Sequence, residues 1–209
     1  HPLPHGLARL GVGEDQNVAD DALDGVAAIE IFTNAADTET KGLDWVNTWR
    51  AGAMAYEASL HMNDTKISSR HTSSSVVGIG SIIDPCIENL LEDAQPGRRA
   101  TLGATWHPDA WSVSLRATHY GEYSDHPAAY GLGKHTWGAK TLFDLTSYYD
   151  VDEHLRISGG ILNVADTYPD RWGSDGEPFS SEIGFKYGWN TVPFGLAGRQ
   201  YTVRAEFTF

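Results

Sequence analysis

The sequence predicts an all-β protein, a section of an antiparallel transmembrane β-barrel with about seven strands. Polar and apolar residues alternate in seven separate segments, whereas helical periodicity is nearly absent. Each segment is roughly 9–13 residues long, about the length that a tilted strand needs to cross a bilayer and longer than most strands of soluble sheets. Short turns alternate with long loops along the chain, which is the sidedness of outer-membrane barrels.

The alternating segments put apolar side chains on one face and Ser, Thr and charged side chains on the other. They lie, in order, at residues 41–49, 53–62, 98–106, 110–120, 140–149, 153–162 and 198–209. In the second segment, AMAYEASLHM, the pattern is clean: one face carries Met54, Tyr56, Ala58, Leu60 and Met62.

The connections between these segments fall into two classes. Tight turns are expected at 51–52, 107–109 and 150–152, and long, Gly-rich, polar loops at 64–96, 123–138 and 165–198. Aromatic residues beside the short turns mark the place of an interfacial girdle. They are Trp45, Trp49, Trp106, Trp111 and Tyr149. A soluble sandwich or closed barrel also alternates, but loops longer than about 12–15 residues rarely recur at one end of such folds.

The strand count predicts that the chain is part of a larger barrel. Complete bacterial barrels have an even number of strands, at least about eight, and an open sheet leaves unpaired edges that lipid does not tolerate. We therefore expect further strands upstream of this chain. Residues 1–27 are interpreted as an extracellular loop segment, and residues 28–209 as the C-terminal part of the barrel.

Composition excludes several classes of protein. Acidic residues outnumber basic ones by 28 to 15, and the net charge of −13 argues against a nucleic-acid partner. No apolar stretch of about 18 residues predicts a transmembrane helix. Cys86 is the only cysteine, so the chain has no internal disulfide; this thiol either pairs with a cysteine elsewhere or is a lone buried thiol.

Three stretches resemble the C-terminal part of TonB-dependent outer-membrane receptors. IFTNAADTETKGLDWVNTW has the Asn, spacer and Gly-hydrophobic-acid order of a descending strand, with Asn34, Gly42, Leu43 and Asp44. ISGGILNVADTYPDRW is similar to the Asn-Leu-Phe-Asp-x-x-Tyr element, at Asn163, Val164, Ala165, Asp166 and Tyr168, and departs from it at Val164 and Ala165. PFGLAGRQYTVRAEFTF has Arg199 at the start of the last strand and Phe209 at its end.

The resemblance implies a 22-stranded barrel whose lumen holds a plug domain. It implies a location in the outer membrane of a Gram-negative bacterium and uptake of a scarce small-molecule ligand, such as a ferric siderophore. The inner-membrane TonB complex would supply the energy through the plug, which is not in this sequence. A carbohydrate or vitamin transporter, a passive porin-like barrel and a soluble β-rich binding protein are the alternatives.

The alternating C-terminal strand is similar to the signal that barrel-assembly machinery reads in outer-membrane proteins. The residues interpreted as this signal are Tyr201, Val203, Phe207 and Phe209. In a simpler interpretation, Phe209 only fills the edge of a core.

The sequence predicts no enzyme, metal site or cofactor. Its nine histidines lack the paired spacing of zinc ligands, and the acidic stretch at 13–25 lacks the ligand order of a calcium loop. No Ser-His-Asp arrangement or phosphate-binding loop is evident.

Ligand contacts are expected on extracellular loops and the upper lumen wall. Arg suits an anionic chelate or carboxylate, and Trp suits a sugar or catecholate face. The candidates are Arg116, Tyr120, His126, Trp137, Arg171, Trp172 and Trp189. The apolar run SVVGIGSII, residues 75–83, is expected to pack against neighbouring loops or the plug.

Overall fold

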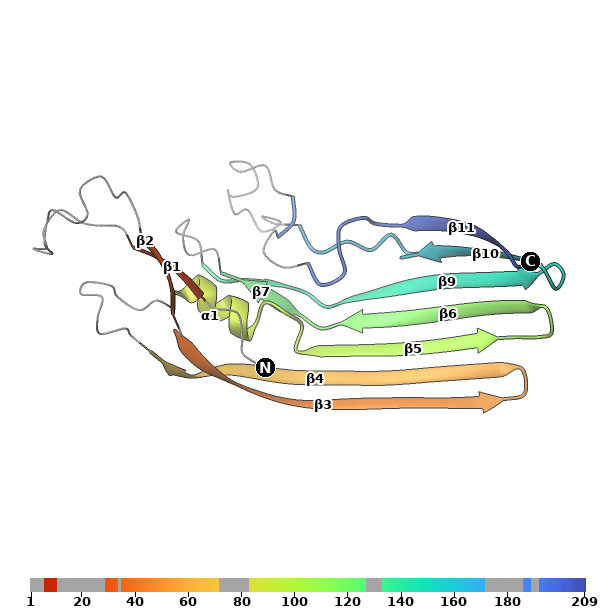
Figure 1. Ribbon diagram of the computed structural model, residues 1–209. Coiled ribbons are helices and arrows are strands. Elements are labelled where there is room, and N and C mark those ends of the chain that lie inside the picture. The colour runs from red at the N-terminus through yellow and green to blue at the C-terminus, as the bar shows by residue number, and fades with distance from the viewer. Residues whose placement is uncertain are drawn as a thin grey trace, which may run out of the picture.

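The computed structural model describes residues 6–10, 29–33, 35–71, 83–126, 133–171, 186–188 and 192–209. Its main body is one seven-stranded antiparallel sheet in the order β11-β10-β9-β6-β5-β4-β3, which Figure 1 shows as a single layer. The strands are β3 (Ala36–Ala51), β4 (Met54–Arg70), β5 (Arg98–Trp106), β6 (Trp111–Tyr120), β9 (Lys140–Asp150), β10 (Leu155–Leu162) and β11 (Gln200–Phe207). The seven predicted strands and their antiparallel arrangement are confirmed.

The first two strands of the sheet are longer than predicted. β4 continues to Arg70, into residues that were expected to be loop, and pairs with β3 as far as Ala36. Hydrogen bonds between side chains of the two strands hold the extension: the hydroxyl oxygens of Thr40 and Thr65 are 2.8 Å apart, and the Ser69 hydroxyl donates to Asp37 at 2.7 Å. Ile67 is the one large apolar residue of the β4 extension, so the alternation gives little apolar signal there.

The long loops carry secondary structure that the sequence pattern did not predict. The 64–96 segment contains α1 (Pro85–Glu92), where Asp84 caps the N-terminus by accepting the Ile87 N–H at 2.8 Å. The 123–138 segment contains the antiparallel pair β7 (Tyr123–Asp125) and β8 (His135–Trp137). β1 (Gly6–Leu10) pairs with β2 (Ile29–Thr33), so the segment 1–27 includes one strand. Of the apolar run 75–83, only Ile83 is described, and it is buried.

The short turns lie at the end of the sheet opposite α1 (Figure 1). Gly52 between β3 and β4 has φ 59°, and Asp109 between β5 and β6 has φ 44°. Between β9 and β10, the Asp152 carboxylate accepts the N–H groups of His154 and Leu155 at 2.8 and 2.9 Å. Aromatic pairs line this end: Trp49 stacks on Tyr56 with centroids 5.2 Å apart, and Trp111 lies 4.5 Å from Tyr149.

The register gives the sheet one apolar and one polar face. Because opposite residues in paired strands share a face, Leu102 joins Ala58 and Ala117 on one face, and Thr101 joins Ser59 and Thr118 on the other. Most of the large exposed apolar side chains of the strands lie on the first face. They include Leu43, Trp45, Leu102, Leu115, Phe143, Ile157 and Val203.

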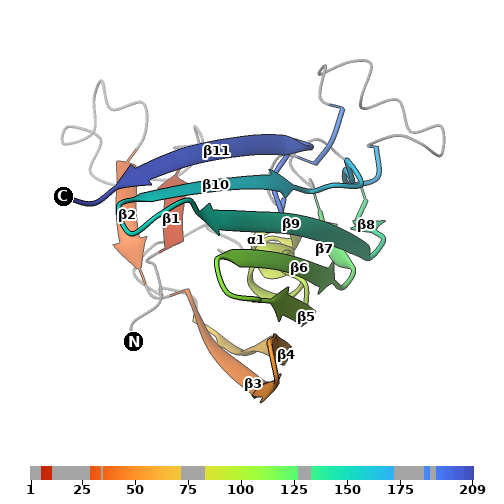
Figure 2. The same cartoon turned by 90° about the vertical axis from the view of Figure 1, so that its right-hand side faces the viewer.

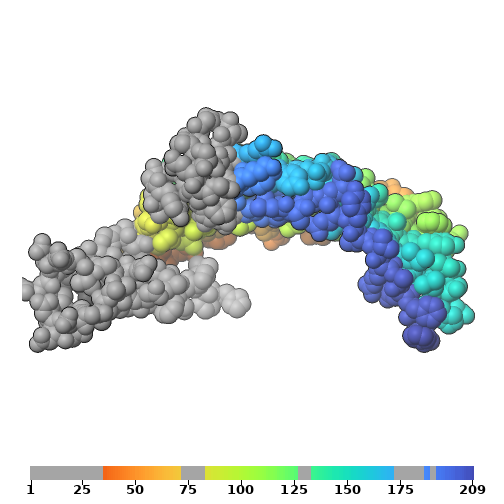
Figure 3. Space-filling view, turned by 90° about the horizontal axis from the view of Figure 1, so that it is seen from above, coloured from red at the N-terminus to blue at the C-terminus, as the bar shows by residue number. Residues whose placement is uncertain are grey.

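Exposed apolar surface of this extent is unusual on a water-soluble monomer and typical of a surface that contacts lipid or another protein. The sheet also twists and bends along its length (Figures 2 and 3), as a section of a curved wall does. In the described part of the chain, no helix combines the length and the apolar character that a membrane span requires.

Candidate functional site

The polar face of the sheet carries a groove of about 430 Å³. β3, β4, β5, β6 and β9 contribute its side chains, so segments far apart in sequence meet there. The charged and aromatic residues of the groove are Glu57, Arg99, Arg116, Tyr120 and Asp144, and hydroxyl groups of Thr48, Ser59, Thr101 and Thr118 lie between them.

An ion pair crosses one whole strand in this groove. Glu57 on β4 and Arg116 on β6 are both opposite Gly103 of β5, and the Arg116 Nε donates to Glu57 Oε1 at 2.8 Å. A Cβ at position 103 would lie 2.5 Å from Glu57 Cγ. The absent side chain of Gly103 therefore provides the space in which Glu57 reaches across β5.

A cation and two aromatic rings lie at the loop end of the same face. The guanidinium carbon of Arg99 is 5.0 Å from the centroid of the Tyr120 ring, a cation–π geometry. Phe194, from the segment between β10 and β11, lies 5.4 Å from the same ring. Tyr120 thus joins the sheet to a distant loop while its ring faces the groove.

Asp144 connects the groove to the NVADTY stretch after β10. Its Oδ1 accepts the Asn163 N–H at 2.8 Å. The Asn163 amide donates to the Thr167 carbonyl at 2.8 Å and accepts the Thr167 N–H at 2.9 Å, which closes a compact loop. Asp166 Oδ1 accepts the Arg199 N–H at 2.8 Å, immediately before β11. This stretch therefore ties the start of the last strand to β9 and β10.

The predicted ligand residues lie in several places. Arg116 and Tyr120 share the groove. His126 is half-buried beside α1, in a small hollow of about 270 Å³. Arg171 lies in the segment that follows β10, and it is exposed. Trp172 and Trp189 lie outside the described residues.

Trp137 is fully buried, so in this conformation its ring does not reach a ligand. It stacks on Tyr123 at 5.5 Å and meets the edge of His135 at 4.7 Å. Burial raises the pKa of Tyr123 to about 12, which keeps the phenol neutral beside the indole. The three rings form a packed core for the β7–β8 pair above the sheet.

The predicted assembly residues lie on the edge strand β11 and just beyond it. Tyr201, Val203, Phe207 and Phe209 are all exposed, and the rings of Phe207 and Phe209 are 5.2 Å apart. The Thr208 N–H donates to the His154 carbonyl at 2.8 Å, and His154 Nδ1 lies 2.9 Å from the Thr208 carbonyl oxygen. The turn after β9 therefore holds the C-terminal residues in line with the strand.

Sequence reasoning missed Glu57, Arg99, Asp144 and Phe194. The first three lie on the polar faces of strands that were predicted, but their proximity depends on the pairing register, which alternation alone does not give. Phe194 lies in a long loop without periodicity, so no sequence signal placed it against Tyr120.

The groove offers groups that can recognise a charged or polar ligand. Arg99 and Arg116 present guanidinium donors, Tyr120 an aromatic surface, and Glu57 and Asp144 carboxylates. Among the described residues, no group of three or more His, Cys, Asp and Glu side chains is placed to hold a metal ion. Such a surface suits reversible contact with a polar or charged small molecule.

Comparison with known proteins agrees with this architecture. Residues 12–164 match the family described as TonB dependent receptor-like, beta-barrel. No curated protein matches the sequence. One solved structure that matches is that of a protein named copper transporter OprC, with a TM-score of 0.54 and 18% sequence identity; the alignment covers 90% of this chain and 26% of that one. The likeness to OprC concerns the fold, and the family match covers most of the sequence: the chain belongs to the TonB-dependent receptor-like β-barrel family.

Proposed function

We propose that this chain forms part of the wall of an outer-membrane receptor in a Gram-negative bacterium. The receptor binds a small ligand outside the cell and takes it up with energy from the TonB complex, which acts through a plug domain outside this sequence. The family consists of transporters of this general kind rather than enzymes.

The observation that carries the proposal is the opposite chemistry of the two faces. One face exposes Leu102, Leu115 and Phe143, which suit contact with acyl chains. The other has the groove with two arginines and a tyrosine, which suits a lumen that contacts a polar ligand. Barrel assembly through Tyr201, Val203, Phe207 and Phe209 belongs to the same proposal.

Within this function, the groove favours an anionic ligand such as a ferric siderophore. No carboxylate of the described residues forms an ion pair with Arg99, and its guanidinium lies over the Tyr120 ring. Arg116 has one acidic partner, Glu57, and both side chains are about half exposed. Both guanidinium groups are therefore within reach of a chelate that enters the groove.

The test is ligand binding by the full-length protein. Arg99→Ala and Arg116→Ala should each weaken binding of an anionic ferric chelate about tenfold, the effect of losing one charge-assisted hydrogen bond, and a neutral chelate should be affected less. Lys41→Ala is the matched control, since Lys41 lies on the apolar-face side of β3, away from the groove. Unchanged affinity in both arginine variants would contradict the anionic ligand class.

Copper is a second ligand to test, because the matching solved structure is that of a protein named as a copper transporter. Saccharides and vitamins remain further alternatives. Uptake of radiolabelled copper or of a saccharide by cells that make the full-length protein, without uptake of ferric chelates, would replace the siderophore proposal while leaving the receptor architecture in place.

A further inference from the structure

The ring of Tyr120 in the groove is already covered by another part of the same chain. Phe194, from the segment between β10 and β11, lies 5.4 Å from the Tyr120 ring centroid with the ring planes at 46°, and both side chains are half-buried. The guanidinium carbon of Arg99, opposite Tyr120 in the register, is 5.0 Å from the same ring. A cation and an aromatic ring of the protein therefore both use the surface that a ligand in the groove would meet.

A tight turn presents Phe194 to the groove. The Gly195 N–H donates to the Val192 carbonyl at 3.3 Å, which closes a four-residue turn. Pro193 takes the second position of this turn, where its fixed φ suits the conformation, and Phe194 takes the third. The ring is thus carried by a locally ordered turn.

The same segment is fastened to the sheet a few residues later. Gly198 has a φ of 65°, and a Cβ there would overlap the Tyr168 hydroxyl, so only glycine allows this close approach. The Arg199 N–H then donates to Asp166 Oδ1 at 2.8 Å. Because these anchors lie so close to the turn, the fold itself defines the position of Phe194.

No carboxylate of the described residues forms an ion pair with Arg99, whereas its basic neighbours on the polar face are paired. His61 on β4 is opposite Arg99 and contacts the Asp44 carboxylate through Nδ1. Lys140 on β9, two strands beyond β5, donates to Asp170 at 2.5 Å. The two carboxylates of the groove are engaged as well, one with a guanidinium and the other with a backbone N–H.

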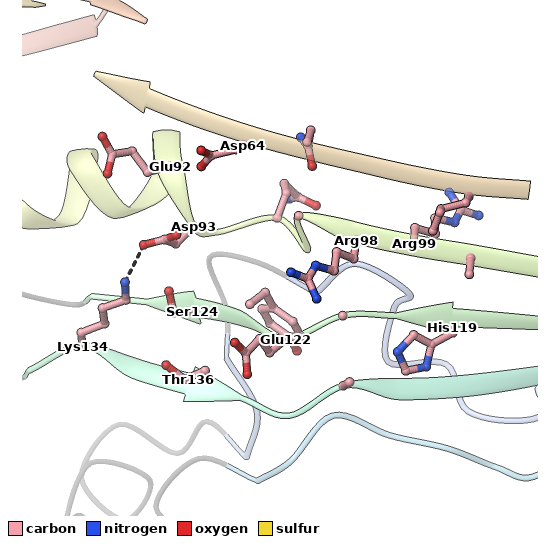
Figure 4. Close-up of a pocket in the computed structure, with 18 residues that line it drawn as sticks. Asp64, Glu92, Asp93, Arg98, Arg99, His119, Glu122, Ser124, Lys134 and Thr136 are labelled. Carbon is pink, nitrogen blue, oxygen red and sulfur yellow. Dashed lines mark hydrogen bonds and ion pairs between the residues drawn. The ribbon is translucent and has the colours of Figure 1, made fainter. Parts of the chain in front are cut away.

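Arg99 also lines the hollow of about 700 Å³ at the start of β5 (Figure 4). The charges of this hollow largely offset one another: Lys134 donates to Asp93 at 2.5 Å, and Asp64 lies 3.5 Å from the Lys66 ammonium. Its other charged and titratable side chains are Glu92, Arg98, His119 and Glu122. The guanidinium of Arg99 therefore borders open space in both the groove and the hollow, within reach of an acidic group.

A ligand that uses Tyr120 has to displace Phe194, and the surface so exposed is covered again only if the ligand brings a ring of its own. We infer that Phe194 occupies, in the free receptor, the place of an aromatic ring of the ligand, and that the groove selects a chelate with such a ring beside an acidic group. The acidic group binds Arg99 and the ring replaces Phe194 on Tyr120. The inference rests on the proposed role of the groove as the ligand site.

The experiment measures the affinity of the full-length protein for two anionic chelates: ferric salicylate, which carries aromatic rings, and ferric citrate, which carries none. The wild type should bind the salicylate chelate more tightly, and Tyr120→Leu should reduce that preference. Phe194→Ala should strengthen binding of both chelates about two- to tenfold, because no ring has to leave Tyr120. Phe194→Tyr, which keeps a ring, should bind like the wild type. Leu196→Ala is the matched control, since Leu196 is exposed in the same segment, and it should leave both affinities unchanged.

A double substitution separates displacement of the ring from a general effect on the loop. In the Tyr120→Leu background, Phe194→Ala should change the affinities little, because the contact that it removes is already absent. The same gain in that background would overturn the inference. Weaker binding by the single Phe194→Ala variant would also overturn it, since Phe194 would then be a contact of the bound ligand.

The Arg99→Ala variant distinguishes failure of this inference from failure of the proposed function. If Arg99→Ala weakens binding of the chelates while Phe194→Ala leaves it unchanged, the groove remains the ligand site and the role of Phe194 is overturned alone. If neither substitution changes the affinities, or the wild type binds neither chelate, the groove is not the site of an anionic ligand and both proposals are overturned.

Discussion

Single glycine positions decide which side chains meet on the polar face. Gly103 lies between Glu57 and Arg116 in the register, and the Glu57 side chain occupies the space where a Cβ would be. The ion pair of the groove is therefore a consequence of an absent side chain on the strand that separates its two partners.

Gly103→Ala should weaken the coupling between Glu57 and Arg116. The new methyl group displaces the Glu57 carboxylate, and a half-exposed pair contributes about 0.2–1 kcal/mol. A double-mutant cycle with Glu57→Gln and Arg116→Gln, measured as the free energy of unfolding with and without the Gly103→Ala substitution, tests this. Gly133→Ala is the control because a Cβ there meets nothing within 4 Å. Equal coupling energies with and without Gly103→Ala would count against this role of the glycine.

Asn163 stabilises the loop after β10 through both its backbone conformation and its side-chain amide. Its φ is 51°, a conformation that Gly adopts without strain, and its amide makes two hydrogen bonds with Thr167. Asn163→Gly should therefore lower the free energy of unfolding by about 1–3 kcal/mol through the lost hydrogen bonds, and Asn163→Ala should lower it further through backbone strain. Urea unfolding of both variants measures the order, and a Gly variant as stable as the wild type would contradict it.

At the scale of elements, the alternation of polar and apolar residues predicted the strands of the sheet, because each strand has one polar and one apolar face. It underestimated β3 and β4, whose outer ends are mostly polar and are held by hydroxyl and carboxylate contacts. It missed α1, because an eight-residue helix spans little more than two turns, which is shorter than the window in which helical periodicity can be recognised. Of the residues that line the groove, only Arg116 and Tyr120 were predicted from the sequence. The others come close to them only through the pairing register of the strands.

An arginine should destabilise the protein to different extents at two adjacent positions of β5. Leu102→Arg puts a guanidinium on the apolar face, where the cost near the bilayer midplane is about 2–4 kcal/mol. Thr101→Arg, at nearly the same depth on the polar face, should cost much less. Unfolding of the full-length protein from lipid vesicles compares the two variants. Equal costs would show that the two faces do not have the assigned environments.

The loops above the sheet are joined by a contact that depends on pH. Asp170 Oδ1 accepts from Lys140 Nζ at 2.5 Å and its Oδ2 accepts the Gly138 N–H at 3.0 Å, and the Lys140 hydrogen bond is the main cause that lowers the pKa of Asp170. Since the folded pKa lies below the unfolded value of about 4, the stabilisation is complete above that pH and is lost as the pH falls through the folded pKa.

Hydrogen exchange of the Gly138 amide should therefore accelerate on acidification below about pH 4, after correction for intrinsic exchange. Asp170→Asn removes the titrating group and should give protection that changes little across the same range. The same acid-dependent loss of protection in the Asn variant would assign the effect to another group.

For the whole molecule, the family match, the seven-stranded sheet and the chemistry of its faces lead to one arrangement. We propose that the apolar face contacts lipid and that the polar face lines the lumen of a receptor barrel, in which β3 and β11 are the edges of the described sheet. The proposed ligand uptake, lipid contact and assembly all depend on this placement.

Site-directed spin labelling along β5 tests this placement most directly. In the full-length protein, with Cys86 replaced by Ser and incorporated in lipid vesicles, single labels are introduced at successive positions from 99 to 105. The arrangement predicts high accessibility to oxygen, which partitions into lipid, at 100, 102 and 104, and low accessibility at 99, 101, 103 and 105. Equal accessibility at odd and even positions, or access of a water-soluble nickel reagent to position 102, would contradict the assignment of the apolar face to lipid.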